Sequence, residues 1–414
     1  MKILKADSGI TVLFSHVPGR LVSVRYTVKC GSVDEKKRKE FGLCHALEHM
    51  FFAGTQTRNW EQLLSGFRNC GAYSNAFTSD THTQYEVLVP KEFLEGAFEL
   101  MADMMYNAQF PAERWETVEK SAVINEILGY HSEPEWLLDE HTMSHALGGS
   151  RKYHSVVGSI DSIKKAKVSD LIPFKERFYT GGNVFLCISG DMTEDEVLRL
   201  VSRYDRWDPR PPEARVLKPV GFNYEEATWL KDGVGQPALC FSKPLPKANS
   251  LRSTSISEMV LEMFSDHLML ELREKQGLCY GISAEVDEQL PWADYLSIKC
   301  VASGPGAKPE MIEQVHRAVD SFVDGYMDSD KIYEARMNTY RNVLMIENSA
   351  ASHTALTSNA WLAGHSENVV EAIQQHIREV SDAEIREAAA EIVLGTYKIT
   401  SMEDTEDFQK CNED

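Results

Sequence analysis

Hydrophobic residues recur along the chain with two different spacings, which predict where strands and helices lie. Alternating apolar and polar residues are typical of a half-buried strand, whereas apolar residues three and four positions apart are typical of an amphipathic helix. The alternation predicts strands over 10–14, 21–28, 72–77, 83–89, 184–189, 227–230, 238–241, 281–286 and 295–301. The longer spacing predicts helices over 41–53, 60–67, 93–105, 112–128, 135–146, 168–178, 259–273 and 312–323. The first two strands are expected to pair with each other.

A proline-rich segment near the midpoint divides this pattern. Residues 207–219 hold four prolines within thirteen positions, a composition typical of a linker. A chain of 414 residues also exceeds what one hydrophobic core usually serves. The order of strands and helices after the linker partly repeats the order before it. We therefore expect an α+β fold with two structurally similar α/β domains, at 1–206 and 220–414, each a mostly antiparallel sheet packed with helices.

The composition of the chain indicates which kinds of binding partner are not expected. The formal net charge is −20, so nucleic-acid binding, which needs a basic face, is not expected. No run of eighteen apolar residues occurs, and the N-terminal residues resemble neither a signal peptide nor a transit peptide. We expect no membrane span and a cytoplasmic location. The eight cysteines include no Cys-x-x-Cys pair and are interpreted as reduced thiols.

The chemistry of the chain is concentrated in the predicted helix 41–53, which contains His45-x-x-Glu48-His49. On a helix, His45 and His49 lie one above the other on a single face, where two imidazoles can share one Zn²⁺. Glu48 lies between them in sequence and can reach a water bound to that metal. This order of residues is the inverse of the commoner zinc motif and is called inverzincin.

A catalytic zinc usually has three protein ligands, so the two histidines need a partner. Glu126, on the predicted helix 112–128, is the candidate. Glu119 lies seven residues earlier on the same face, about 10 Å away along the axis, so both carboxylates can hardly bind one ion. The expected arrangement has Glu126 on the metal and Glu119 beside the ligands, orienting them or tuning the local charge.

Other histidines and one cysteine must also be considered as possible site residues. His141 and His145 are also four residues apart on a predicted helix and form a rival metal pair, but no acidic residue stands between them in the right place. We expect them to be structural or surface residues. Cys44 precedes His45, yet adjacent helical residues point about 100° apart, so it is interpreted as a packing thiol. No role is assigned to His82 or His131.

The motif and the spacing to Glu119 and Glu126 resemble those of the pitrilysin-type inverzincin metallopeptidases, a family that includes insulin-degrading enzyme and the processing peptidase of mitochondria. The resemblance extends over nearly the whole chain. Residues 71–78 resemble the family's edge strand, against which substrate is laid, and residues 272–280 resemble its Arg/Tyr pair, here Arg273 and Tyr280.

The resemblance implies a zinc endopeptidase with a fold like that of LuxS and the processing peptidases, and with one Zn²⁺ per chain. Its metal ligands would be His45, His49 and Glu126, its catalytic residues Glu48, Glu119, Arg273 and Tyr280, and its substrate-binding residues Asn75, Ala76 and Phe77. Glu48 would activate the water, Arg273 and Tyr280 would stabilise the oxyanion or anchor substrate carbonyls, and the edge strand would bind peptide backbone.

The resemblance also implies an enclosed chamber for peptides or unfolded segments. One chain carries both the zinc motif and the Arg/Tyr pair, so we expect a homodimer. The alternative is a non-catalytic structural or peptide-binding homologue.

Overall fold

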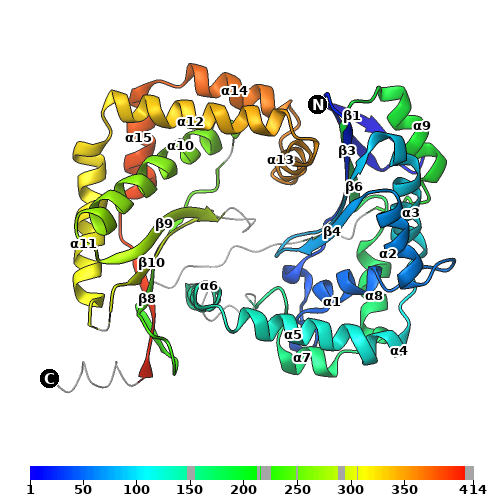
Figure 1. Cartoon of the computed structure of the whole chain (residues 1–414), viewed down its shortest axis with the longest axis horizontal. Coiled ribbons are helices and arrows are strands. Elements are labelled where there is room, and N and C mark those ends of the chain that lie inside the picture. Colours follow the sequence, from blue (N-terminus) through cyan, green and yellow to red (C-terminus); the bar gives the residue numbers. More distant parts are fainter. Residues whose placement is uncertain are drawn as a thin grey trace. The chain divides into compact units, whose positions relative to one another are not determined.

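The computed structural model describes residues 1–146, 154–211, 215, 225–248, 250–287, 294–304 and 306–405. These fold into two compact units (Figure 1). The first consists of Met1–Leu128, His154–Leu217 and Val343–Ala372, and the second of Gly129–Tyr153, Lys218–Asn342 and Ile373–Asp414.

The first unit is built on a six-stranded sheet in the order β1-β2-β6-β3-β5-β4. Its strands are β1 (Lys2–Lys5), β2 (Thr11–His16), β3 (Leu21–Val28), β4 (Tyr73–Thr78), β5 (Thr83–Pro90) and β6 (Val184–Gly190). β2 and β6 run parallel, and every other neighbouring pair is antiparallel. The prediction that the first two apolar strands pair with each other is wrong, because β6 lies between β2 and β3.

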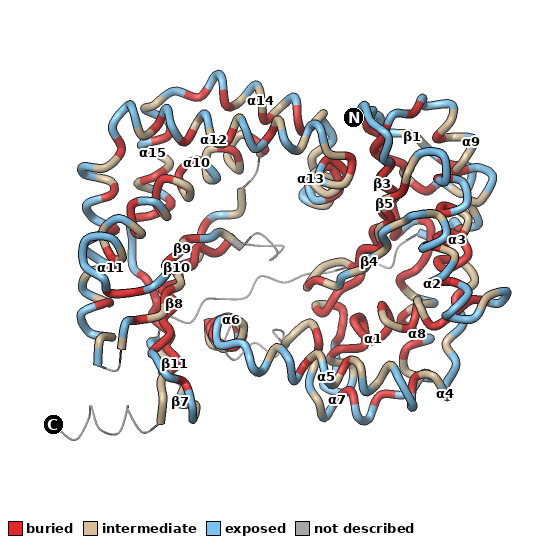
Figure 2. The backbone as a smooth tube through the Cα atoms, viewed as in Figure 1, coloured by how far each residue is buried: buried red, intermediate tan, exposed pale blue. Residues whose placement is uncertain are grey.

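Both faces of this sheet are covered, and β3 shows why. Val22, Val24 and Tyr26 alternate with Ser23 and Arg25, and all five are buried (Figure 2). The apolar residues face the α1 and α3 side of the sheet, where the Tyr26 ring meets Phe98 of α3. The polar residues share their face with α13.

The helices of the first unit are α1 (Leu43–Phe51), α2 (Trp60–Asn69), α3 (Leu94–Asn107), α4 (Ala112–Arg114), α5 (Lys120–Tyr130), α7 (Ile160–Lys165), α8 (Val168–Phe178), α9 (Glu194–Tyr204) and α13 (Ala350–Leu362). Short 3₁₀ turns lie at Ser32–Asp34, Arg38–Glu40 and Lys91–Phe93. A π-helical turn, η4 (Trp115–Glu119), joins α4 to α5. Polar side chains cap several helices; the Asn59 side chain, for example, accepts from Gln62 N at the start of α2.

The second unit has a five-stranded sheet in the order β7-β11-β8-β10-β9. The strands are β7 (Ala227–Leu230), β8 (Ala238–Leu245), β9 (Cys279–Asp287), β10 (Asp294–Ala302) and β11 (Lys398–Glu403). The helices are α6 (Pro134–Ala146), α10 (Leu251–Leu268), α11 (Lys308–Ser321), α12 (Ser329–Glu347), α14 (Val369–Glu379) and α15 (Asp382–Val393), with π-helical turns η5 (Met269–Glu274) and η6 (Phe322–Tyr326).

The two sheets share one topology. β7, β11, β8, β10 and β9 correspond in order and direction to β2, β6, β3, β5 and β4, and each sheet has its single parallel pair in the same place. The prediction of two similar, mostly antiparallel domains is confirmed. The corresponding strands β4 and β9 each form an edge of their sheet.

Two helices are exchanged between the halves of the sequence. α6 lies in the first half, yet it packs on β8 and β11 of the second unit. α13 lies in the second half, yet it packs on β2, β3 and β6 of the first unit. The expected ranges 1–206 and 220–414 therefore keep each sheet intact but assign these two helices differently from their packing.

The described part of the expected linker 207–219 packs on the first unit. Trp207 is buried and lies edge-on to Tyr26 and Tyr106, with ring centroids 6.1 and 5.1 Å away. Arg215 donates to both carboxylate oxygens of Asp34, at 3.0 and 2.7 Å. Residues 212–214 and 216–219 lie outside the described residues.

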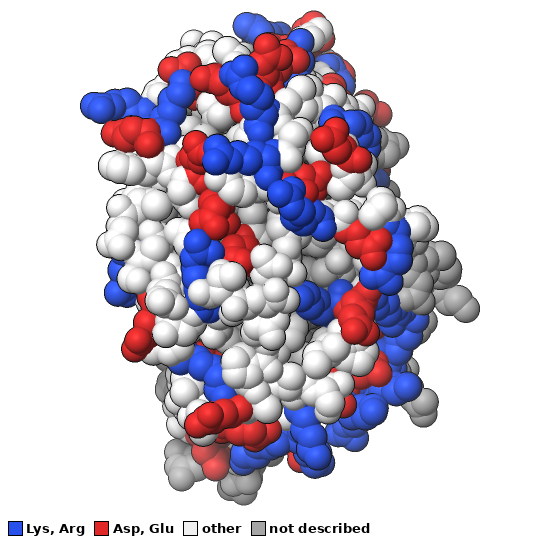
Figure 3. Space-filling view, turned by 90° about the vertical axis from the view of Figure 1, so that its right-hand side faces the viewer, with Lys and Arg blue, Asp and Glu red and all other residues white. Residues whose placement is uncertain are grey.

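On the face seen in Figure 3, acidic and basic side chains are interspersed over uncharged surface. None of the helices in the described part of the chain has the length and hydrophobicity that a membrane span requires.

Candidate metal centre

Helix α1, which carries the histidine motif, is fixed at its first turn by a buried carboxylate. Glu35 accepts hydrogen bonds from Gly42 N at 2.8 Å and Cys44 N at 2.7 Å, so it satisfies two of the free N–H groups there. The ring of His154 lies 2.7 Å from the same carboxylate and stacks on Phe41. His154 carried no signal in the sequence, because it lies more than a hundred residues from Glu35.

Gly42 is required at this entry for two reasons. Its φ of 87° lies in the left-handed region, and a Cβ there would meet Val157 O at 2.7 Å and Gly158 Cα at 2.9 Å. Gly158, which also has a positive φ of 74°, needs the same close approach from the other side. The two glycines let the segment before α1 and the 154–159 segment touch backbone to backbone.

The two motif histidines converge on one glutamate. His45 Nε2 and His49 Nε2 lie 3.5 and 3.3 Å from Glu126 Oε2, and their ring centroids are 4.8 Å apart. Ligand-capable atoms of the three residues all lie within 4.8 Å of one another. Within the described parts of the chain, no other group of three or more His, Cys, Asp or Glu side chains meets this criterion.

This donor set fits a zinc ion. Two imidazoles and one carboxylate are a known catalytic zinc set, which leaves a fourth position for water. His45 is buried, and its pKa is lowered to about 4 by burial and by the neighbouring His49, so its ring is neutral and able to ligate. Burial alone would lower the pKa of His49, but Glu119 and Glu126 outweigh it and raise that pKa to about 9. The two carboxylates favour the protonated ring of His49, and a metal ion would bind in place of that proton.

Glu119 contacts the other nitrogen of the His49 ring. Its Oε2 lies 3.7 Å from His49 Nδ1, whereas Glu126 lies on the Nε2 side. His49 is thus held between two carboxylates, of which Glu126 belongs to the ligand cluster and Glu119 does not. A carboxylate on the second ring nitrogen of a metal-bound histidine fixes the tautomer and the ring orientation.

Glu48 lies buried beside the cluster. It is 8% exposed, and Thr78 Oγ1 donates a hydrogen bond to its Oε2 at 2.7 Å. Burial raises the pKa of Glu48 to about 7, although the bond from Thr78 lowers it. A carboxylate with a pKa near neutrality suits a general base. Thr78 was not among the predicted site residues; its only sequence signal was its position at the end of the predicted edge strand.

The segment predicted to bind substrate is an edge strand. β4 pairs only with β5 among the described strands, so its other side offers free backbone groups. Asn75 and Phe77 are exposed and Ala76 is half-buried. The Arg25 guanidinium lies 5.7 Å from the centre of the Phe77 ring.

Arg273 and Tyr280 belong to the second unit. Arg273 lies on η5, and Tyr280 is the second residue of β9, the edge strand that corresponds to β4. The guanidinium lies 5.1 Å from the centre of the tyrosine ring, which is 84% exposed. The structure brings these two residues together at one end of an edge strand.

The competing residues are not members of the cluster. The rings of His141 and His145 stack in parallel at 6.2 Å next to Trp229, in the second unit. His82 contacts Ser79 Oγ through Nδ1, and burial lowers its pKa to about 4. His131 packs against Trp136, also in the second unit.

Cys44 behaves as a packing thiol. It is buried, its Sγ donates to Gly31 O at 3.2 Å, and it lies 3.5 Å from the Sγ of Cys30.

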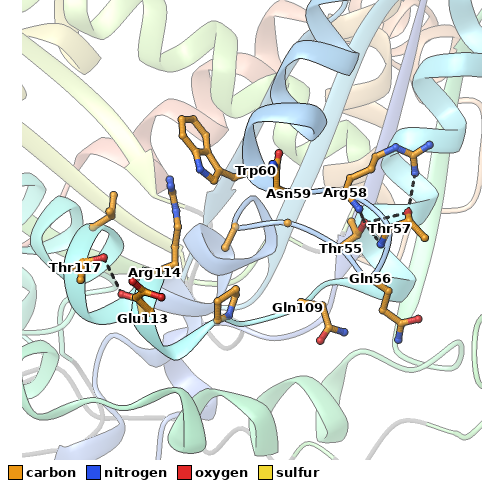
Figure 4. A pocket seen from close by; sticks show the side chains of 14 residues that line it. Thr55, Gln56, Thr57, Arg58, Asn59, Trp60, Gln109, Glu113, Arg114 and Thr117 are labelled. Carbon is orange, nitrogen blue, oxygen red and sulfur yellow. Dashed lines mark hydrogen bonds between the residues drawn. The ribbon is translucent and has the colours of Figure 1, made fainter.

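A cavity of about 600 Å³ lies next to the segment that follows α1. It is lined by residues 53–60, which follow α1, and by six residues between 109 and 118 (Figure 4). In Figure 4 the Arg114 side chain extends from its helix towards Trp60. Arg114 is also the residue that donates to Glu119, so it connects the wall of the cavity to the metal centre.

Comparison with known protein families finds two matches along the chain. The profile described as "Insulinase (Peptidase family M16)" matches residues 11–159, and that described as "Peptidase M16 inactive domain" matches residues 165–339. The first match contains the whole candidate metal centre, and the second contains Arg273 and Tyr280.

Individual proteins are also similar to this chain, one in sequence and two in fold. An uncharacterized zinc protease of Rickettsia felis is 24% identical over 359 residues, which is 84% of this chain and 84% of that protein. The crystal structure of a peptidase M16 inactive domain from Pseudomonas fluorescens superposes with a TM-score of 0.87 at 16% identity, covering 97% of both chains. A protease from Helicobacter pylori gives a TM-score of 0.85 at 18% identity, covering 97% of this chain and 98% of that one.

Proposed function

Because the chain belongs to the insulinase family of metallopeptidases, peptidase family M16, we propose that it is a zinc-dependent endopeptidase. The observation that carries the proposal is the convergence of His45, His49 and Glu126, with the buried carboxylate of Glu48 next to them. One Zn²⁺ per chain would bind these three side chains.

When bound, the zinc ion would acidify a water molecule and polarise the carbonyl of the bond to be cleaved. The carboxylate of Glu48 would act as the general base, accepting a proton from the attacking water and passing it to the leaving amine. The hydrogen bond from Thr78 to Oε2 helps to fix the orientation of this carboxylate. Glu119 holds the His49 ring in place through Nδ1.

The free edge of β4 supports a peptide substrate. An extended chain can add to this edge as a further strand, with its backbone bonded to residues 75–77. Strand addition selects by backbone, so it favours peptides and unfolded segments over folded proteins. This substrate class agrees with the expected processing or degradative peptidase.

We also propose that Arg273 and Tyr280 bind substrate carbonyls or the developing oxyanion in a homodimer that encloses a chamber. Their proximity to each other at the end of β9 supports a shared role. Light scattering at micromolar concentration tests the dimer, and a monomer would contradict it. The cytoplasmic location stays a prediction.

The alternative is a peptide-binding or structural homologue without hydrolysis. Residues 165–339 match a family described as an inactive domain, and this description is the reason to consider the alternative. The complete motif around His45 and the buried base Glu48 favour the peptidase.

Metal analysis and a peptide-cleavage assay separate the two functions. The purified protein is incubated with a mixed peptide library, with and without a chelator, and the products are identified by mass spectrometry. Zinc-dependent cleavage supports the peptidase, whereas bound zinc without any product supports the non-catalytic homologue.

A further inference from the structure

Arg114 is held between an aromatic ring and the carboxylate that contacts His49. Its Nε donates a hydrogen bond to Glu119 Oε1 at 2.8 Å, and its Nη2 lies 2.7 Å from the same oxygen in an ion pair. Its guanidinium also lies 4.4 Å from the centre of the Trp60 ring. Only 21% of the Arg114 side chain and 12% of the Glu119 side chain are exposed. This cation is therefore fixed on two sides in a partly desolvated position.

The π-helical turn η4 makes this pairing possible. Arg114 and Glu119 are five residues apart, and in an α-helix that spacing puts two side chains about 140° from each other. In η4 the Lys120 N–H donates to Trp115 O, five residues back, so positions five apart come onto one face. Trp115 anchors the turn, because it is fully buried and its Nε1 donates to Ala166 O at 2.9 Å.

The two oxygens of Glu119 have different partners. Arg114 takes Oε1, and Oε2 faces His49 Nδ1 at 3.7 Å. Without Arg114 the carboxylate would be free to rotate about its last torsion and to leave the histidine ring. The ring would then lose the contact that orients its Nε2 towards Glu126.

We propose that Arg114, backed by Trp60, is a positioning residue of the zinc site: it locks Glu119 against His49 and thereby sets the affinity for the metal. The inference rests on the zinc site of the proposed function and adds two residues that are not among its ligands. Because both residues line the cavity of Figure 4, the metal affinity would depend on side chains that solutes in that cavity can reach.

The test measures Zn²⁺ affinity by competition with a chromophoric chelator, on the full chain. Arg114→Ala should weaken zinc binding about 10- to 100-fold, the range seen when an outer partner of a histidine ligand is lost. Arg114→Lys should give an intermediate value, because lysine keeps the charge but not the planar guanidinium that contacts both Glu119 and the Trp60 ring.

Arg58 provides the matched control. It lines the same cavity and is paired with Glu99 and Asp103, but not with Glu119. Arg58→Ala should leave the zinc affinity within about twofold of the wild type, even if it lowers the melting temperature, because its partners do not touch the metal cluster.

A double-mutant cycle identifies the route of the effect. If Arg114 acts through Glu119, then Arg114→Ala combined with Glu119→Gln should bind zinc no more weakly than Glu119→Gln alone. Additive losses would overturn the inference, and so would wild-type zinc affinity in Arg114→Ala. Should Arg114→Ala fail to fold, the Arg114→Lys variant decides, and an unchanged affinity there rejects the proposal.

The outcomes distinguish this inference from the proposed function. Zinc binding without peptide cleavage in the wild type would reject the peptidase and leave the role of Arg114 testable. Peptide cleavage by a wild type whose zinc affinity does not respond to Arg114 would reject only the inference.

Discussion

Thr78 Oγ1 donates a hydrogen bond to Glu48 Oε2 at 2.7 Å. The last residue of edge strand β4 thereby holds the carboxylate of the proposed general base. The strand proposed to bind peptide and the group proposed to activate water are thus joined by one direct contact. Substrate that adds to β4 would meet a base whose orientation the same strand fixes.

Replacing Glu48 with Gln should leave zinc binding intact and reduce peptide cleavage by about 100- to 10,000-fold, since the amide cannot accept the proton. Metal content by mass spectrometry and cleavage rate by chromatography check both parts. Glu61→Gln, at an exposed position in the first turn of α2, is the control and should be fully active. Undiminished turnover by zinc-loaded Glu48→Gln protein would exclude Glu48 as the base.

Replacing Thr78 with Val should lower kcat by about 10- to 100-fold and change KM little, because a hydrogen bond to a charged group contributes about 1.5–3 kcal/mol. Thr78→Ser keeps the hydroxyl and should restore most of the rate. Steady-state kinetics on one peptide from the library screen give both parameters. Equal rates for the Val and Ser variants would show that the hydroxyl has no part in positioning Glu48.

Adding Zn²⁺ to metal-free protein should raise its melting temperature, because an ion that binds only the folded state stabilises it by about 2.7 kcal/mol at a hundred times its Kd. Glu126→Gln removes one ligand and should abolish most of this increase. Thermal denaturation with and without zinc measures it. An undiminished increase in the Glu126→Gln variant would mean that the ion binds elsewhere.

Replacing Ser358 of α13 with Val should destabilise the first unit by about 1–3 kcal/mol or more, since buried donors left without a partner cost that amount. Ser358 Oγ lies 3.0 Å from Thr27 Oγ1 and accepts from Gln84 Nε2 at 3.1 Å, both on the sheet of the first unit. Denaturant unfolding measures the change.

Asn359→Ala, at an exposed position on the same helix, should have little effect and serves as the control. If Ser358→Val were as stable as the wild type, these buried bonds between α13 and the sheet would contribute nothing to the stability of the unit.

Much of the candidate site followed from helix geometry. The spacing of His45 and His49 puts both imidazoles on one face of α1, as the structure has them. The spacing of Glu119 and Glu126 likewise brought both carboxylates to the same histidine. The π turn and its ion pair with Arg114 could not be predicted, since an α-helical period places Arg114 on another face.

Among the strands, β11 shows where the pattern failed. Its residues Lys398 to Met402 are all buried, including the lysine and two hydroxyl residues, so no apolar–polar alternation marks the strand. β6 was predicted as a strand, but its insertion between β2 and β3 was not, because neither neighbour lies near it in sequence.

By itself, the amino-acid order determined whatever depends on residues within a few helical turns: the histidine pair with its intervening glutamate, the two acidic positions on a second helix, and the repeated succession of strands. Tertiary structure alone decided the order of strands in each sheet, the exchange of α6 and α13, the bond from Thr78 to Glu48 and the contact of His154 with Glu35. The physical reason is that these contacts join residues from thirty to more than three hundred positions apart. Their free energy comes from burying surfaces that meet only in the folded chain, and no local period encodes which surfaces those are.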